Sequence, residues 1–171
     1  NNILNVPRFG AINVHTSLLP KYRGCNPLQW AIINNERETG ITLHKMNERF
    51  DAGDIIDQEK VAINFFSSWK DVKIIIEKKI SHIIRRNVDQ ILSGKITSIP
   101  QSEHDASYYQ RRTADDGCFL WSDPVIDIYN LTRALVSPLP GAYYIDNFGK
   151  KTRLTKFHKI EDLAVMKTKI N

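Results

Sequence analysis

The sequence lacks the features that mark several special classes of protein. It has only two cysteines in 171 residues, Cys25 and Cys118, and they show no Cys-x-x-Cys or Cys-x-x-His spacing. A disulfide scaffold and a zinc site are therefore not expected, and a reducing, cytoplasmic compartment is the default. No apolar stretch approaches the roughly 18 residues that span a bilayer, so no membrane partner is expected.

A large excess of charge is also missing. The 24 Lys and Arg residues outnumber the 19 Asp and Glu residues by only five, which suits a phosphate ester as partner but does not require a nucleic acid. The composition, 42% hydrophobic and 25% charged, is close to that of an average globular protein. The length corresponds to one domain at roughly 150 residues per domain.

Hydrophobic patterning predicts strands and helices in alternation, and hence an α/β fold. The most regular element is an amphipathic helix that begins at the capping-box sequence Ser68–Asp71 and ends at Gly94. A shorter helix is expected to begin at Pro27 with Asn26 as its cap. Residues 96–117 read as irregular, and the tail from Glu161 gives weak signals. The other predicted elements are strands at 10–15, 41–46 and 55–63, a helix at 124–135, and a hairpin of 142–145 with 152–157.

Three groups of residues carry possible chemistry. Asn13 and His15 alternate at the end of a strand, so their side chains share a face. A loop with hydroxyls and two cations follows them, and Asp51 and Asp54 flank Ala52-Gly53 in a turn after the next predicted strand. An amide, an imidazole and a carboxylate suit transfer of a group to an amine, because they can bind a developing oxyanion and move a proton. The alternative remains open that these residues are structural turn formers.

The segment Ile12-Asn13-Val14-His15-Thr16-Ser17-Leu18-Leu19-Pro20-Lys21-Tyr22-Arg23-Gly24 resembles the signature of the folate-dependent formyltransferases. This family includes glycinamide ribonucleotide, methionyl-tRNA and sugar-nucleotide formyltransferases. The resemblance continues through 38–42 and 51–56, and covers about residues 3–160. His15 and Asp51 are 36 positions apart (51 − 15), as the family pattern expects.

The resemblance implies a Rossmann-like sheet and a set of roles for the site. Asn13 would hold the formyl oxygen, His15 would act as an acid or oxyanion stabiliser, and Asp51 would tune His15 and accept the amine proton. The donor would be 10-formyltetrahydrofolate, with no metal, and Leu19-Pro20 can be a cis peptide in this family. The segment lying against the pterin would be Asp51, Ala52, Gly53, Asp54 and Ile55.

The later segments 108–117, 130–135 and 138–142, with Trp121, resemble the sugar-nucleotide branch, whose members serve lipopolysaccharide or O-antigen biosynthesis. The acceptor implied is a UDP- or dTDP-linked amino deoxysugar. Two alternatives remain: a methionyl-tRNA formyltransferase, with tRNA the less expected partner, and a catalytically silent fragment or interaction module. The candidate substrate-binding residues are Ser17, Lys21, Tyr22, Arg23, Arg111 and Arg112.

Cations and tyrosines can neutralise a pyrophosphate and stack on a base. Arg111 and Arg112 can equally well pair with Asp115 and Asp116 in a solvated loop. A structural role is expected for Arg133, which follows Tyr129 by one turn of a predicted helix.

The resemblance also predicts how the chain is organised. Residues 1–105 would form the C-terminal half of the catalytic domain, and residues 106–171 an extension with a helix and a small β-hairpin. The N-terminal half of the Rossmann-like domain would precede Asn1, and the exposed sheet edge would favour pairing with another chain, such as a homodimer partner. We expect the 171-residue piece alone to be inactive or nearly so.

Overall fold

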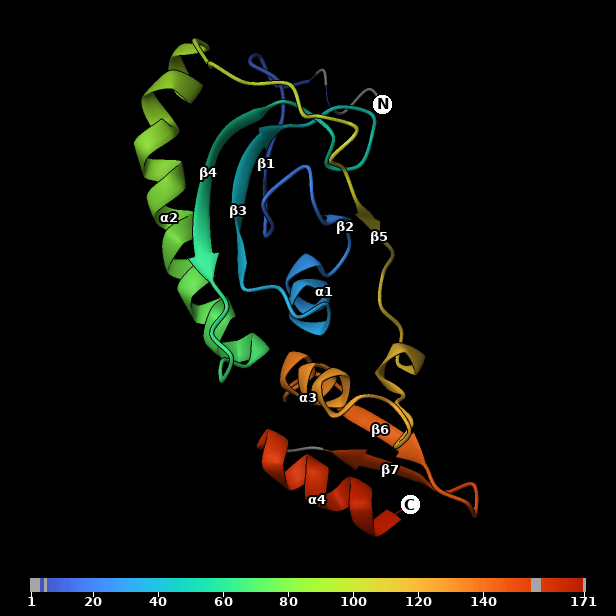
Figure 1. Cartoon of the computed structure of the whole chain (residues 1–171). Coiled ribbons are helices and arrows are strands. Elements are labelled where there is room, and N and C mark those ends of the chain that lie inside the picture. The colour runs from blue at the N-terminus through green and yellow to red at the C-terminus, as the bar shows by residue number, and fades with distance from the viewer. Residues whose placement is uncertain (1–3, 5, 155–157, 171) are drawn as a thin grey trace.

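The computed structural model describes residues 4, 6–154 and 158–170, with the backbone only for Ile170. Strands and helices alternate through most of the chain, which confirms the predicted α/β class (Figure 1). The elements in chain order are β1 (Ile12–His15), β2 (Arg23–Gly24), α1 (Pro27–Ile33), β3 (Glu38–Lys45), β4 (Ile55–Ala62), α2 (Trp69–Ser93), β5 (Tyr108–Tyr109), the 3-10 helix η2 (Asp115–Gly117), α3 (Val125–Ala134), β6 (Ala142–Ile145), β7 (Lys151–Leu154) and α4 (Ile160–Ile170).

The main sheet has three strands in the order β1-β3-β4, and both pairings are antiparallel. In the β1–β3 pairing Asn13 lies opposite His44, and His15 lies opposite Thr42. The β3–β4 pairing is irregular between Leu43 and His44. This register places side chains of two neighbouring strands together at the end of the sheet from which the β3–β4 loop leaves (Figure 1).

Helix α2 covers β4 along most of its length (Figure 1). Its start is the predicted capping box: the Ser68 hydroxyl accepts from the Asp71 amide, and the Asp71 carboxylate accepts from the Ser68 amide at 2.8 Å. Gly94 ends the helix in the left-handed conformation, as the sequence predicts. None of the described helices combines the length and apolar character that spanning a bilayer requires.

Helix α1 begins at Pro27 as predicted, but the expected cap at its start is absent. Asn26 adopts a left-handed backbone conformation, and its side chain makes no capping hydrogen bond to α1. Instead Oδ1 of Asn26 accepts from the amide of Arg112 at 3.1 Å. The prediction of an Asn26 cap was wrong because the Asn26 side chain binds a segment that is distant in sequence and does not bind the first turn of α1.

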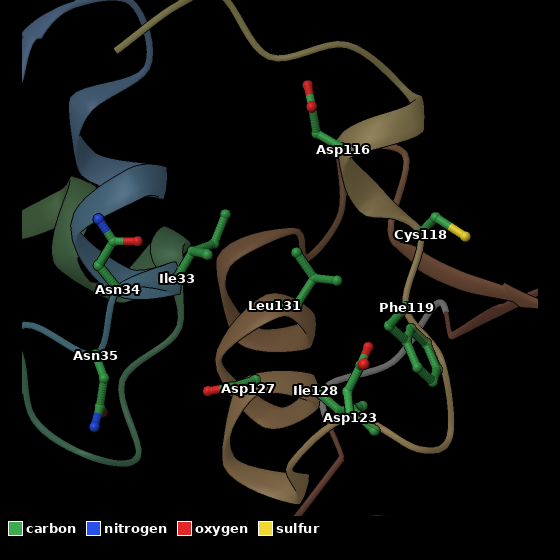
Figure 2. Close-up of a pocket in the computed structure, with 10 residues that line it drawn as sticks. All are labelled: Ile33, Asn34, Asn35, Asp116, Cys118, Phe119, Asp123, Asp127, Ile128 and Leu131. Atoms are coloured by element: carbon green, nitrogen blue, oxygen red, sulfur yellow. The ribbon is translucent and has the colours of Figure 1, made fainter. Parts of the chain in front are cut away.

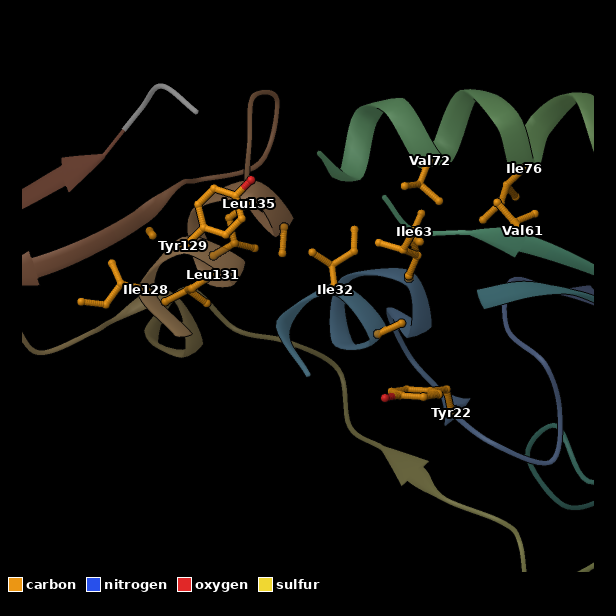
Figure 3. Close-up of a cluster of buried hydrophobic side chains, with 14 of the residues drawn as sticks. Tyr22, Ile32, Val61, Ile63, Val72, Ile76, Ile128, Tyr129, Leu131 and Leu135 are labelled. Carbon is orange, nitrogen blue, oxygen red and sulfur yellow. The ribbon is translucent and has the colours of Figure 1, made fainter. Parts of the chain in front are cut away.

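The hydrophobic core runs through two layers that meet at α1. Figure 3 shows Val61, Ile63, Val72 and Ile76 of the β4–α2 layer on one side of Ile32, and the apolar side chains of α3 on the other. Ile32 is fully buried. The short helix α1 therefore joins the sheet to the C-terminal elements.

The C-terminal region holds the hairpin β6–β7 and the helix α4 against α3. The hairpin agrees with the prediction through Leu154, and the predicted residues 155–157 lie outside the described part of the chain. Helix α4 lies in the tail whose sequence gives only weak signals. Within the predicted irregular segment, β5 pairs in parallel with β2. The Leu19-Pro20 peptide is cis, as the resemblance allows, and so is Ser137-Pro138.

Candidate active site

The sheet brings three polar side chains together at one end. Asn13 and His15 share a face of β1, and the register adds His44 of β3, which lies beside Asn13. The Nδ2 atom of Asn13 is 3.4 Å from Nε2 of His44. The rings of His15 and His44 meet edge to face with centroids 6.5 Å apart. His44 belongs to this cluster although the sequence motifs do not single it out; its alternation with Thr42 on β3 was the available signal.

The β3–β4 loop brings Asp51 to the same cluster. Its Oδ2 atom lies 3.5 Å from Nδ1 of His15, and its Oδ1 atom lies 3.6 Å from Nε2 of His44. The amide of Gly24 donates to Oδ2 at 2.8 Å. The carboxylate thus sits between two imidazoles, with one backbone donor fixing its orientation.

The main chain determines which ring nitrogen of each histidine carries a proton. Nε2 of His15 is 2.7 Å from the carbonyl oxygen of Tyr22, and Nδ1 of His44 is 2.8 Å from the carbonyl oxygen of Lys45. A carbonyl only accepts, so each of these nitrogens donates. In the neutral rings, Nδ1 of His15 and Nε2 of His44 are then lone-pair nitrogens, and these are the two that face Asp51.

Burial, the largest cause, lowers the pKa of His44 below its ordinary value. The Lys45 carbonyl and the Asp51 carboxylate act in the opposite direction, while His15 and Arg23 lower this pKa further. Because the neutral form is favoured, Nε2 of His44 keeps the lone pair that accepts from Asn13. The amide of Asn13 is thereby oriented, and its second N–H has no hydrogen-bond partner among the described residues.

A second set of contacts holds the Asp51 loop in place. The side-chain amide of Gln101 donates to the carbonyl oxygens of Asp51 at 2.8 Å and Gly53 at 2.6 Å. Arg23 donates in turn to Oε1 of Gln101 from Nε at 3.0 Å and from Nη2 at 2.8 Å. The Arg23 guanidinium also contacts Glu103 at 3.1 Å. Arg23 is 0% exposed, and through Gln101 it supports the loop that carries Asp51.

Of the predicted donor-binding residues 51–55, Asp51 lines the site, and the others lie in the turn after it and at the start of β4. Asp51 lines a hollow of about 390 Å³. A Cβ atom at Gly53 would lie 1.8 Å from the carbonyl oxygen of Lys45, so glycine is required there. Ile55 begins β4. Residues 52–55 are not part of the lining, and their contact with a donor stays a prediction.

Sequence reasoning missed the residues just before Asp51. The hollow is lined by Leu4, Asn13, His44 and Asp51 together with residues 46–50, of which Met46 and Phe50 supply exposed apolar surface. His15 is 7% exposed and lies outside the lining, so it communicates with the hollow through Asp51. Polar groups able to hold an oxyanion and a proton thus border a partly apolar hollow.

The six predicted substrate-binding residues fall into two groups. Ser17, Tyr22 and Arg23 are buried: Ser17 donates to the Lys21 carbonyl at 2.7 Å, and the Tyr22 hydroxyl donates to Glu36 at 2.8 Å. Burial raises the pKa of the Tyr22 hydroxyl, which therefore remains a donor. These contacts occupy the polar groups of all three, and a role in substrate binding stays a prediction that their packing does not favour.

Lys21 and Arg111 are exposed, whereas Arg112 is partly buried. The Arg112 guanidinium lies over the ring of Trp30, 5.5 Å from its centroid, and its Nε and Nη2 atoms are buried with no hydrogen-bond partner in the described part of the chain. Burial, the largest cause, lowers the pKa of Arg112, and Asp116 acts to raise it. The Asp116 carboxylate accepts instead from the amide and hydroxyl of Thr113. Arg112 is thus a cation with unused donors.

Figure 2 shows another hollow, of about 410 Å³, between the end of α1 and helix α3. Its walls combine apolar side chains such as Ile128 and Leu131 with three carboxylates, those of Asp116, Asp123 and Asp127. None of the predicted catalytic or substrate-binding residues lines it. In the described residues no group of three or more His, Cys, Asp or Glu side chains is arranged to hold a metal ion.

Solved structures of formyltransferases resemble this chain over most of its length. A 4-N formyltransferase from Francisella tularensis is 30% identical with a TM-score of 0.75, over 86% of this chain and 62% of that one. An N-formyltransferase from Helicobacter canadensis, in complex with folinic acid and dTDP-3-aminofucose, is 28% identical with a TM-score of 0.64, over 72% and 46%. A formyltransferase from Anoxybacillus kamchatkensis, in complex with UDP-4,6-dideoxy-4-formamido-L-AltNAc and tetrahydrofolate, is 28% identical with a TM-score of 0.58, over 64% and 57%.

These matches confirm the expected Rossmann-like formyltransferase fold, and the chain spans about half to two thirds of the length of the proteins it matches. The family model described as formyl transferase matches residues 1–86, which is half of the 171 residues. The matched region includes Asn13, His15, His44 and Asp51. This chain belongs to the formyl transferase family.

Proposed function

We propose that this chain carries the catalytic centre of an N-formyltransferase, which moves a formyl group from 10-formyltetrahydrofolate to the amine of a nucleotide-linked amino deoxysugar. The observation that carries the proposal is the Asp51 carboxylate, held between His15 and His44 beside Asn13 at the edge of a hollow. The ligands of the Helicobacter and Anoxybacillus enzymes, a folate and a nucleotide sugar in each case, support the choice of donor and acceptor.

The residues of the hollow fit the two requirements of formyl transfer to an amine. Negative charge develops on the formyl oxygen, and the second N–H of Asn13 would donate to it. The amine loses a proton as it attacks, and Asp51 is the carboxylate that borders the hollow. A proton taken by Asp51 can pass to the lone pair on Nδ1 of His15, 3.5 Å away. The transfer is direct, with no enzyme nucleophile: the bond from the amine nitrogen to the formyl carbon forms, the bond from that carbon to the donor nitrogen breaks, and the proton lost by the amine is returned to the leaving donor nitrogen.

The donor supplies a formyl group bound to a nitrogen. The hollow suits the aromatic part of such a molecule, because Met46 and Phe50 expose apolar surface beside Asn13 and the polar main chain of the loop. Residues 46–51 would therefore hold the donor, with Asp51 at the reacting end. The apolar walls also reduce the access of water to the carboxylate.

For the acceptor, Arg112 is the predicted residue whose surroundings fit best. Its Nε and Nη2 atoms are buried without partners, and a pyrophosphate oxygen would satisfy them with charge-assisted hydrogen bonds. The Arg112 guanidinium lies over the ring of Trp30, which packs against Tyr109 with ring centroids 5.3 Å apart. This aromatic pair would offer surface for a base.

The test is a formyl-transfer assay on the protein as its gene encodes it. We expect tetrahydrofolate to be released with 10-formyltetrahydrofolate and a dTDP- or UDP-linked amino deoxysugar, and a formylated sugar to appear by mass spectrometry. Turnover with methionyl-tRNA and none with any amino sugar would replace the proposed acceptor by tRNA. No turnover with either acceptor would favour the non-catalytic alternative.

A further inference from the structure

A hollow of about 330 Å³ lies at the end of β3 that is remote from Asp51. Its walls come from the loop before β3, the loop after β4, and the last turn of α3, which contributes Arg133. Glu38 and His44 are six positions apart on β3 (44 − 38), which is about 20 Å at roughly 3.3 Å per residue. The hollow is therefore separate from the candidate active site.

Arg133 is a buried cation without an anionic partner in the described residues. It is 1% exposed, Nε donates to Asn130 Oδ1 at 2.9 Å, and Nη1 donates to the carbonyl oxygens of Asn64 and Ser67 at 3.3 and 3.0 Å. The guanidinium carbon lies 5.6 Å from the centroid of the Tyr129 ring. All these partners are neutral, and Nη2 forms no hydrogen bond to the described part of the chain. Nη2 is thus the nitrogen available to the hollow that Arg133 lines.

A buried charge without a counter-charge is costly, and an anion that pairs with it recovers part of that cost. Burial, the largest cause, also lowers the pKa of Arg133, although a guanidinium remains protonated at neutral pH. The hydrogen bonds to Asn64 and Ser67 show the expected structural role, because they tie the loop after β4 to α3. These hydrogen bonds use only some of the N–H groups of Arg133, because an arginine has five N–H donors in a planar fork.

A second arginine lines the same hollow. Arg37 is exposed, and no acidic side chain of the described residues forms an ion pair with it. Glu36 is the acidic residue of the lining, and its Oε1 accepts from the hydroxyl of Tyr22 at 2.8 Å. Phe65 adds an aromatic wall that is 41% exposed.

We propose that this hollow binds a small phosphate-bearing anion between Arg133 and Arg37. The planar fork of an arginine matches the oxygens of a phosphate. Free phosphate and a phosphate ester would bind the two arginines in the same way. Only an ester would also contact Phe65, through its organic part. The proposal does not depend on the formyl-transfer activity.

The test is calorimetric titration of the protein, as its gene encodes it, with two probes, inorganic phosphate and phenyl phosphate. We expect saturable binding that Arg37→Gln weakens by roughly tenfold or more, the loss expected for one charge-assisted hydrogen bond. The matched control is Arg85→Gln, which removes the same charge from the exposed face of α2 and should leave binding unchanged. Tighter binding of phenyl phosphate, abolished by Phe65→Ala, identifies an ester as the ligand; equal binding of both probes identifies free phosphate.

Arg133→Lys keeps the positive charge but removes Nη2, and we expect it to weaken binding as well, provided that its melting temperature stays near that of the wild type. If Arg133→Lys does not fold, the comparison of Arg37→Gln with Arg85→Gln is sufficient to test whether the hollow binds phosphate. No saturable binding of either probe, or equal weakening by Arg37→Gln and Arg85→Gln, would overturn the proposal.

Discussion

Asp51 combines an unusual backbone with an oriented carboxylate. Its φ of 50° lies in the left-handed region, which non-glycine residues rarely adopt, and the Gly24 amide and the Gln101 side chain hold it there. An asparagine at this position can still accept from Gly24 but cannot take a proton. The backbone contacts and the proton chemistry of residue 51 can therefore be separated by mutation.

We expect Asp51→Asn to lower kcat by about 100-fold or more, the usual effect of removing a general base, while the thermal melt changes little. Steady-state kinetics and circular dichroism on the protein as its gene encodes it, with the same samples, measure both. The control is Asp89→Asn on the exposed side of α2, which should leave kcat unchanged. An unchanged kcat in Asp51→Asn would contradict the assignment of the proton acceptor.

His44 provides a second prediction for a single residue. Leucine removes the lone pair that accepts from Asn13, whereas glutamine retains an acceptor. We expect His44→Leu to lower kcat by roughly tenfold, the value of one oriented hydrogen bond, and His44→Gln to retain more activity.

The pH profile gives an independent measurement of the same role. Burial lowers the pKa of His44, so the acceptor is present at neutral pH and is lost only as the pH falls below the ordinary value of about 6.5. We expect the acid limb of wild-type kcat to include this loss. An identical acid limb in His44→Leu would show that His44 does not contribute to it.

The sequence motifs single out Asn13, His15 and Asp51, which the fold brings together, but they do not predict the surroundings of Arg23 and Tyr22. The motif residues lie on one strand and one loop, where local pattern is informative. Arg23 is buried by contacts with Gln101 and Tyr108, which are 78 and 85 positions away. The support that Arg23 gives to the Asp51 loop is therefore a tertiary effect that local sequence does not encode.

Among the elements, α2 was predicted closely because its signals are local. The capping box, the apolar spacing and Gly94 all lie within the helix or at its ends. Helix α4 was not predicted, since its burial depends mainly on one fully buried side chain, Leu163, in contact with distant parts of the fold. The ends of a helix can be predicted from sequence when the capping residues lie within the helix or next to it. An element that is stabilised mainly by packing against distant segments cannot be predicted in this way.

The contact between α2 and β4 includes a cluster of polar side chains. Nε and Nη2 of Arg86 donate to the two carboxylate oxygens of Asp57 at 2.5 and 2.8 Å, and Asn87 donates to Oδ2 at 2.5 Å. Partial burial acts to raise the pKa of Asp57, but the hydrogen bonds from Arg86 and Asn87 outweigh it and hold this pKa below its ordinary value. The ionised form of Asp57 therefore stabilises the fold.

We expect Asp57→Asn to reduce the free energy of unfolding at pH 7 by roughly 1–2 kcal/mol. A depressed carboxyl pKa adds stability that is present above the ordinary pKa of about 4 and disappears as the pH falls through the lowered value. The difference between wild type and variant, measured by urea unfolding, should therefore shrink in acid. The exposed pair Lys60–Glu38 gives the control, because Glu38→Gln should change stability little. A pH-independent difference would contradict the assignment.

For the whole molecule, α1 connects the sheet layer and the α3 layer through Ile32. We expect Ile32→Ala to cost roughly 2–5 kcal/mol, as for other fully buried large-to-small changes, and to reduce the stability of both layers together. Hydrogen exchange measured by mass spectrometry should show protection falling equally in β3 and α3. Ile145→Ala, on the exposed part of the hairpin, should change little. Loss of protection in α3 alone would show that the two layers unfold independently.

The pairing of β2 with β5 also has a consequence for the order in which the molecule assembles. It joins Arg23 and Gly24 to Tyr108 and Tyr109 across 85 positions, and contacts of such long sequence separation form slowly because loop closure must come first. Helix α2 needs only local contacts and can form earlier. During synthesis on the ribosome, Asp51 is made 50 residues before Gln101 (101 − 51). A nascent chain that already contains Asn13, His15 and Asp51 therefore still lacks the contacts that hold the Asp51 loop, and these contacts form only after the segment 101–109 has folded back.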